Sequence, residues 1–178
     1  DVSNEELRRR LIVVPQEPFL FANTISYNLE FAEPNATVQN MIDAFAELGL
    51  LDWLESLPLG LDTHVGQRGS SLSAGERQLV ALVRASMVKP DVLVLDEATS
   101  SVDSLTEVRI SRALERLALG RTTISIAHRL STASRADRVV MLENGRIVED
   151  GSHRALLESA GKYAALYEAW LNSTSGET

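Results

Sequence analysis

Residues 92–95 form an uninterrupted apolar run, Val-Leu-Val-Leu, that ends in Asp96-Glu97. A run that is apolar on both faces predicts a parallel β-strand buried between layers of helices. The segments Leu11–Val14 and Thr122–Ile126 are short and rich in β-branched residues, and they predict strands of the same sheet. The chain therefore predicts an α/β fold with a mostly parallel sheet.

Only helical patterns occur between the first two predicted strands. Thr37 begins a helix with apolar residues at spacings of three and four, and Gly49 ends it. Ser73 begins a second helix that ends at about Lys89, and residues 50–72 are predicted to form a loop. We therefore predict an α/β core of residues 1–22 and 90–171, an inserted helical subdomain of residues 23–89, and a polar tail of residues 172–178.

Capping and turn residues predict the remaining elements. Ser3 and Ser104 are predicted N-caps, because each is followed by Glu three residues later. Asn144-Gly145 predicts the tight turn of a β-hairpin within residues 138–149. Two further helices are predicted to close the chain.

Composition excludes several classes of protein. With 178 residues, 44% hydrophobic and 24% charged, the chain is globular rather than disordered. Its net charge of -8 disfavours nucleic acid as a partner. The absence of cysteine excludes disulfides, thiolate metal sites and a cysteine nucleophile. No apolar run approaches the roughly 18 residues that span a bilayer, so any link to a membrane must come from a partner or another part of a longer chain.

Polar side chains follow each predicted parallel strand: Gln16, the pair Asp96-Glu97, and His128. Because parallel strands present their carboxyl ends at one edge of a sheet, these side chains are expected to converge on one site. Adjacent carboxylates favour a hydrated Mg²⁺, and the second carboxylate could polarise an attacking water. The alternatives are that each residue is a solvated strand end, or that the acidic pair simply precedes the next helix.

The segment Ser73-Ala74-Gly75-Glu76 has two interpretations. Ser73 and Glu76 have the spacing of a capping box, which alone explains both residues. A helix start with small residues also leaves N–H groups accessible to a phosphate. Physical reasoning from the sequence gives these two interpretations equal weight.

Taken together, the motifs resemble the nucleotide-binding domain of ATP-binding cassette (ABC) transporters of the exporter type. The resemblance spans about residues 1–171 and rests on segments similar to the glutamine loop (14–21), the exporter-specific segment (63–69), the signature (72–76), the Walker B strand (92–97), the loop after it (100–103) and the switch histidine (126–129). It implies a P-loop NTPase (RecA-like) fold with an inserted all-helical subdomain. Chromosome-maintenance ATPases and translation factors share part of this pattern. The chain lacks the coiled-coil insertion of the former, and residues 98–103 differ from the sequence typical of the latter.

The resemblance also implies roles for the strand-end residues, with ATP and Mg²⁺ as ligands. Gln16 and Asp96 would coordinate Mg²⁺. Glu97 would be the general base for the hydrolytic water, and His128 would hold the γ-phosphate of ATP. Gln16, Glu97 and His128 are thus the implied catalytic residues.

A second set of residues is implied to act between two copies of the domain. Ser73 and Gly75 would contact ATP bound to the opposite subunit, and Asp103 would link the two sites. The implied partners are a second nucleotide-binding domain, identical or paralogous and arranged head to tail, and the coupling helices of a transmembrane domain. The implied location is the cytoplasmic face of the cell membrane.

The sequence departs from the family pattern at several points. It contains no G-x-x-x-x-G-K-[ST] phosphate loop, and neither of its lysines, Lys89 and Lys162, follows a glycine-rich loop. We therefore expect a C-terminal fragment of the domain that is inactive alone. Ala74, Glu76 and Leu79 stand where glycine, glutamine and arginine are usual. Glu76 would add negative charge near a phosphate, or simply improve the helix cap.

Overall fold

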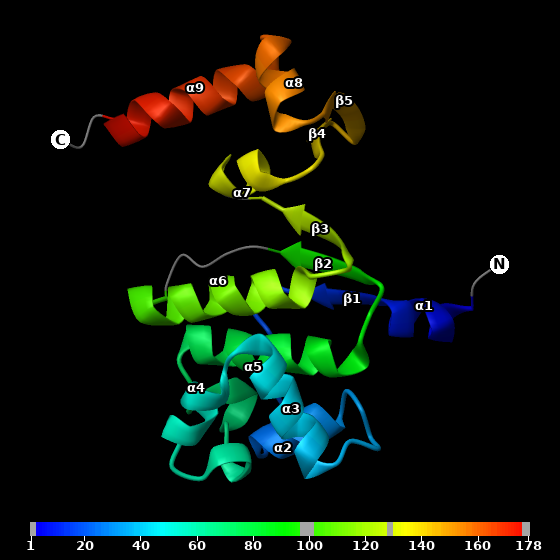
Figure 1. Cartoon of the computed structure of the whole chain (residues 1–178), viewed down its shortest axis with the longest axis vertical. Helices are drawn as coiled ribbons and strands as arrows, with labels where there is room; N and C mark the ends of the chain where they lie inside the picture. Colours follow the sequence, from blue (N-terminus) through cyan, green and yellow to red (C-terminus); the bar gives the residue numbers. More distant parts are fainter. Residues whose placement is uncertain (1–2, 97–101, 128–129, 176–178) are drawn as a thin grey trace. The chain divides into compact units, whose positions relative to one another are not determined.

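The computed structural model describes residues 3–96, 102–127 and 130–175 (Figure 1). It divides into two compact units, Asp1–Ile126 and Ala127–Thr178. Each unit has a hydrophobic cluster of its own, so the two are described separately.

A parallel sheet in the order β1-β2-β3 organises the first unit. Its strands are β1 (Leu11–Val14), β2 (Val92–Asp96) and β3 (Thr122–Ile126), which confirms the three predicted strands. Val14 pairs with Leu95, and Asp96 pairs with Ile126. All three carboxyl ends therefore lie at one edge of the sheet.

Among the described residues of the first unit, helices α5 (Ala74–Val88) and α6 (Ser104–Ala118) cover one face of this sheet. Leu93 is fully buried and Val14 is 4% exposed, because α5 and α6 belong to the same core. Val13 and Ile124 share the opposite face and are 55% and 53% exposed. The burial predicted for residues 92–95 is thus only partial on this face, where Val94 is half-buried between the exposed Val13 and Ile124.

Helices are the regular elements between β1 and β2, as predicted, apart from an isolated antiparallel bridge between Thr24 and His64. The helices are α2 (Ile25–Glu30), α3 (Val38–Leu48), α4 (Leu51–Ser56) and α5. The predicted loop over residues 50–72 is wrong, because it contains α4 and the short 3₁₀ turns Gly60–Asp62 and Gln67–Gly69. Helix α4 has no side-chain cap at Leu50, so the sequence carries no start signal for it.

Most predicted helix boundaries are confirmed by their caps. Helix α1 (Asn4–Arg10) begins after Ser3, whose Oγ accepts the Glu6 N–H at 3.1 Å. Gly49 ends α3 with a φ of 70°, a left-handed conformation that suits glycine. One prediction is corrected, since the N-cap of α6 is Asp103 rather than Ser104. Aspartate and serine are equally strong N-caps, so the sequence alone does not decide between these adjacent residues, and the helix begins one residue earlier than predicted.

The second unit contains the predicted hairpin and closing helices. Strands β4 (Val139–Glu143) and β5 (Arg146–Gly151) are antiparallel, and Asn144 and Gly145 both have positive φ in the turn between them. Around the hairpin lie α7 (Leu130–Arg135), which was not predicted, α8 (His153–Glu158) and α9 (Lys162–Ser175). Helix α9 continues past residue 172, so the predicted tail begins too early. No described helix has the length and apolar character needed to cross a bilayer.

Acid should weaken this hairpin through one ion pair. The Arg138 Nε and Nη2 atoms donate to the two Asp150 carboxylate oxygens at 2.7 and 2.6 Å, which lowers the pKa of Asp150. A carboxylate whose pKa is lower in the folded than in the unfolded state stabilises the fold at pH values above its unfolded pKa, which is about 3.9. This stabilisation is lost as the pH falls through the folded-state pKa. We expect Asp150→Asn to lower the melting temperature of the chain at pH 7, and the difference from wild type to shrink below about pH 4. A difference that stays constant down to pH 2 in thermal unfolding would contradict this assignment.

Candidate functional site

The first group of site residues lies at the carboxyl edge of the parallel sheet. Gln16 follows β1 by two residues and is exposed, whereas Asp96 is the last residue of β2 and is half-buried. The β1–β2 register, in which Val14 pairs with Leu95, places both side chains at the same edge. A carboxylate and an amide oxygen are ligands that Mg²⁺ accepts, so this pair fits the implied metal. Glu97 and His128 lie outside the described residues.

Helix α5 holds the segment that carries Gln16. The half-buried Arg84 of α5 donates from Nη1 to the Phe19 carbonyl oxygen at 3.1 Å. Burial lowers the pKa of Arg84 from its usual value, which is high enough for the guanidinium to remain charged. A cavity of about 160 Å³ beside this contact is lined by Val14, Pro15 and Arg84 among others. The segment after β1 is therefore held to α5 by this hydrogen bond.

The second group begins at the start of α5. The Ser73 Oγ accepts the Glu76 N–H at 3.2 Å, and the Glu76 carboxylate accepts the Ser73 N–H at 2.8 Å. This reciprocal pair is the predicted capping box. Because Oγ acts in it as an acceptor, the exposed Ser73 hydroxyl keeps its proton available for donation to a ligand. The structural and functional interpretations of the segment are therefore compatible.

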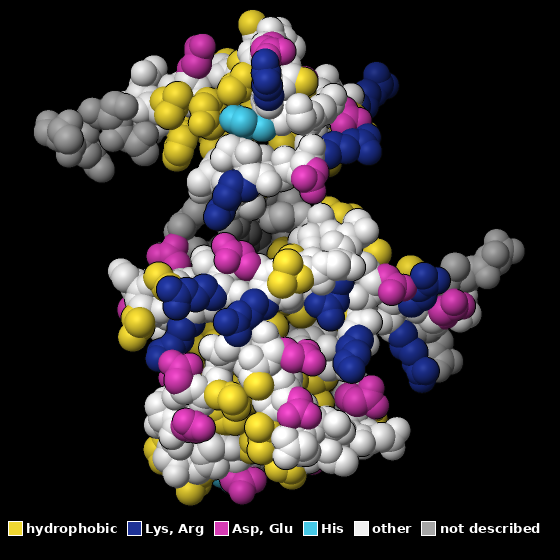
Figure 2. Space-filling view, in the orientation of Figure 1, with side chains coloured by type: hydrophobic (Ala, Val, Ile, Leu, Met, Phe, Trp, Pro, Cys, Tyr) yellow, Lys and Arg dark blue, Asp and Glu magenta, His cyan; other side chains and the backbone are white. Residues whose placement is uncertain are grey.

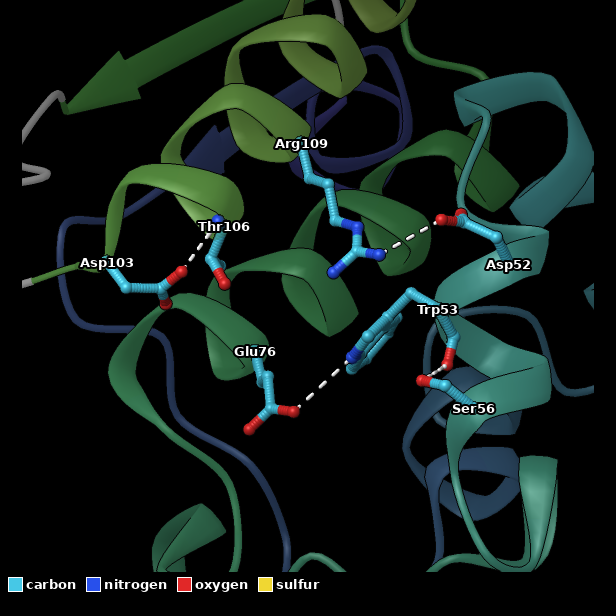
Figure 3. Close-up of polar contacts among 7 residues, drawn as sticks. All are labelled: Asp52, Trp53, Ser56, Glu76, Asp103, Thr106 and Arg109. Atoms are coloured by element: carbon cyan, nitrogen blue, oxygen red, sulfur yellow. Dashed lines mark hydrogen bonds and ion pairs between the residues drawn. The ribbon is translucent and has the colours of Figure 1, made fainter.

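Asp103 caps the start of α6. Its Oδ1 accepts the backbone N–H of Thr106 at 3.0 Å. This hydrogen bond lowers the pKa of Asp103 from its usual value, so the cap is ionised at neutral pH. Figure 3 shows Asp103 and Thr106 beside the first turn of α5, which carries Glu76.

Gly75 allows the two helix starts to touch. A Cβ atom at Gly75 would lie 2.4 Å from the Thr106 Cγ2 atom and 2.7 Å from the Val102 Cγ1 atom. Both distances are shorter than real Cβ contacts, so no residue with a side chain fits here without movement. The structure therefore brings Ser73, Gly75 and Asp103 together, with the partly positive N-terminal ends of two 15-residue helices in contact.

Helix α4 is attached to both of these helices. The Trp53 Nε1 atom donates to the Glu76 carboxylate at 3.4 Å, and Arg109 of α6 pairs with Asp52 at 3.0 Å (Figure 3). Figure 2 shows that basic side chains gather over α6. Sequence reasoning missed Trp53, because it lies in a segment predicted as loop and 23 positions before its partner. No local signal in the sequence could have found this contact.

Comparison with known proteins decides the family. The family model described as "ABC transporter" matches residues 1–100, which is more than half of the chain. The chain belongs to the ABC transporter family. The match includes the glutamine-loop, signature and Walker B segments on which the resemblance rests.

The matches to similar proteins extend over nearly the whole length of this ABC chain. It is 46% identical to the mitochondrial iron-sulfur clusters transporter ABCB7 of Oryzias latipes and to the ABC transporter aclQ of Aspergillus oryzae, over 95% and 94% of its length. The solved structure of a bacterial Atm1-family ABC exporter with ATP bound superposes with a TM-score of 0.84 at 41% identity, over 95% of this chain. The predicted P-loop NTPase fold with a helical insertion is thereby confirmed. The chain spans 23% and 21% of the two relatives and 30% of the solved chain.

Proposed function

We propose that this chain belongs to the ATP-hydrolysing domain of an ABC exporter. The observation that carries the proposal is the parallel β1–β2 register, in which Val14 pairs with Leu95, because the carboxyl ends of both strands then lie at one edge of the sheet, where Gln16 and Asp96 follow or end them. In open α/β sheets this edge is where ligands bind. The similarity to an Atm1-family exporter that holds ATP supports the same conclusion.

In this proposal the strand-end residues carry the hydrolytic chemistry. Asp96 and Gln16 hold Mg²⁺, which when bound supplies positive charge to the phosphate oxygens. Glu97 accepts a proton from the attacking water, and His128 donates a hydrogen bond to the γ-phosphate. The phosphate loop that would cradle the triphosphate is not part of the 178-residue sequence.

The residues at the two helix starts act on the nucleotide of a second domain. Ser73 donates its free hydroxyl proton and the first turn of α5 presents N–H groups that have no acceptor within the helix. Asp103 caps α6 between Val102 and Thr106, the two residues that pack against Gly75, and it links the two sites. The two domains, identical or paralogous, would face each other head to tail.

An aromatic surface is the proposed contact for the transmembrane domain. Phe19, Tyr27 and Phe31 are 53%, 43% and 62% exposed, and all three lie around or beside Phe21, with ring centroids 5.2, 6.4 and 4.4 Å from it. Residues 63–65 lie next to this cluster, because Ile25 donates to the Thr63 oxygen and Val65 to the Asn23 oxygen. Exposed aromatic clusters of this kind mark interaction sites. The coupling helices of a transmembrane domain, at the cytoplasmic face of the membrane, would dock there.

Replacing Phe31 with serine should separate ATP hydrolysis from transport. Because Phe31 is 62% exposed, the change should cost the fold little, while it removes apolar area from the proposed contact. We expect a several-fold loss of transport per ATP hydrolysed, measured in vesicles that contain the complete transporter. Val38→Ser is a matched control, since Val38 is 63% exposed on α3. An equal amount of transport per ATP hydrolysed in the two variants would argue against this surface as the contact for the transmembrane domain.

The direct test of the proposed function is ATP hydrolysis by the complete transporter that carries this chain. Purified protein in vesicles should release phosphate from ATP, and chelation of Mg²⁺ should abolish the release. A complete transporter that neither binds nor hydrolyses ATP would overturn the proposal.

The 178-residue chain alone should bind ATP weakly and hydrolyse none. The missing phosphate loop supplies many of the hydrogen bonds to the phosphates, and Gln16 and Asp96 cannot replace them. We expect calorimetric titration with Mg-ATP to give a dissociation constant larger than about 1 mM. A constant of 1 mM corresponds to a binding free energy of about -4.1 kcal/mol. Micromolar affinity would show that the phosphate loop is dispensable for binding.

A further inference from the structure

Both carboxylate oxygens of Glu76 have donors within this chain. Oε2 accepts the Ser73 N–H at 2.8 Å, and Oε1 accepts the Trp53 Nε1–H at 3.4 Å (Figure 3). One side chain thus joins the N-cap of α5 to the middle of α4. A glutamine at this position could not reproduce this arrangement, because only one of its two terminal polar atoms is an acceptor.

Trp53 is a rigid partner for this carboxylate. It is 3% exposed, and its ring packs against the fully buried Phe45 of α3 with a centroid separation of 6.0 Å. The Ser56 hydroxyl donates to the Trp53 carbonyl oxygen at 2.6 Å. The position of the indole N–H is therefore fixed by the packing of Trp53 against α3. This N–H is the only polar group of the indole ring.

Glu76 in turn restrains Ser73. The Ser73 backbone N–H and hydroxyl oxygen are both bonded within the capping box, so the direction of the remaining hydroxyl proton depends on where Glu76 holds the cap. The contacts form one continuous chain from Phe45 through Trp53 and Glu76 to Ser73. Movement of α4 relative to α5 would thereby move the exposed Ser73 hydroxyl.

We propose that Glu76 is a positioning residue that ties the Ser73 hydroxyl to Trp53, so that α4 sets the donor geometry toward the nucleotide. This inference rests on the proposed function, in which Ser73 contacts ATP. It also explains the acidic residue at the start of α5. The negative charge is bound by two donors of the same chain and completes a structural link, instead of acting on the phosphate.

Two variants remove the same link in different ways. Trp53→Phe removes the donor and keeps the aromatic packing, and Glu76→Gln keeps an acceptor for the cap and leaves the indole N–H unmatched. In the complete transporter, each should raise the KM for Mg-ATP about two- to tenfold, the range of a net hydrogen bond, and leave kcat within about twofold. The double variant should raise KM no more than the larger single effect, because both changes break one contact.

Trp170→Phe is the matched control, since Trp170 is the other tryptophan and lies on α9 in the second unit. Its KM should equal that of wild type. A merely structural role for Trp53 and Glu76 would lower the melting temperature and kcat and leave KM unchanged, which overturns the inference.

Additive KM effects, or an unchanged KM in either single variant, would also overturn it. If the wild-type transporter hydrolyses ATP normally and these variants match it, only the positioning role fails. If the wild type hydrolyses no ATP, the proposed function fails and takes this inference with it. Unfolding by denaturant gives a second check, because additive losses of unfolding free energy would show that Trp53 and Glu76 are not linked.

Discussion

Replacing Glu97 with glutamine is expected to lower the kcat for ATP hydrolysis by the complete transporter about 10²–10⁴-fold. Glu97 directly follows β2, whose last residue is Asp96 at the edge of the sheet. Glutamine has nearly the same shape as glutamate and cannot accept a proton from water at neutral pH. The variant therefore removes general-base catalysis and preserves volume. Steady-state release of phosphate measures the loss.

The size of the KM change separates this role from a binding role. A residue that acts only in the transition state should lower kcat and kcat/KM together, so KM for Mg-ATP should stay within a few-fold of wild type. Glu55→Gln is a suitable control, because Glu55 is an exposed acid on α4 and should leave turnover unchanged. Normal turnover in Glu97→Gln would refute the assignment of Glu97 as the base.

The edge of the sheet could be predicted from sequence because its signals are local. Strands β1 and β2 are short apolar runs that are followed by or end in a polar residue, and parallel pairing then places their carboxyl ends at the same edge. The pairing needed no knowledge of side-chain packing. The roles of these residues, by contrast, came from the family resemblance and stay predictions.

The contacts at the helix starts could not be predicted, because they join residues far apart in the sequence. Trp53 meets Glu76 across 23 positions, and α4 begins without a capping side chain. Position 75 requires glycine because Val102 and Thr106 pack closely against it, and these residues follow it by about 30 positions. Such constraints arise only when the helices are packed. A sequence pattern therefore identifies the residue but not the packing contact that requires it.

Replacing Gly75 with alanine should destabilise the chain, against the expectation from helix propensity. In a helix interior, alanine is more stable than glycine by about 0.5–1 kcal/mol. The added methyl would lie 2.4 Å from the Thr106 Cγ2 atom and 2.7 Å from the Val102 Cγ1 atom. Both neighbours are β-branched, and β-branched side chains have restricted χ1 freedom, so they cannot swing aside as the end of a long side chain would. Overpacking of this kind costs about 1–3 kcal/mol.

The net result is an expected loss of up to about 2.5 kcal/mol in the free energy of unfolding, since the propensity gain offsets part of the overpacking cost, and urea denaturation of the 178-residue chain measures it. Ala74→Val is the control in the same turn, because Ala74 is exposed and its change affects propensity alone, by less than about 1 kcal/mol. In the complete transporter, Gly75→Ala should also lower ATP turnover, since the methyl pushes the start of α5, which carries Ser73, away from the start of α6. A variant more stable than wild type would mean that the two helix starts are not in contact, and that Ser73 and Asp103 do not act together.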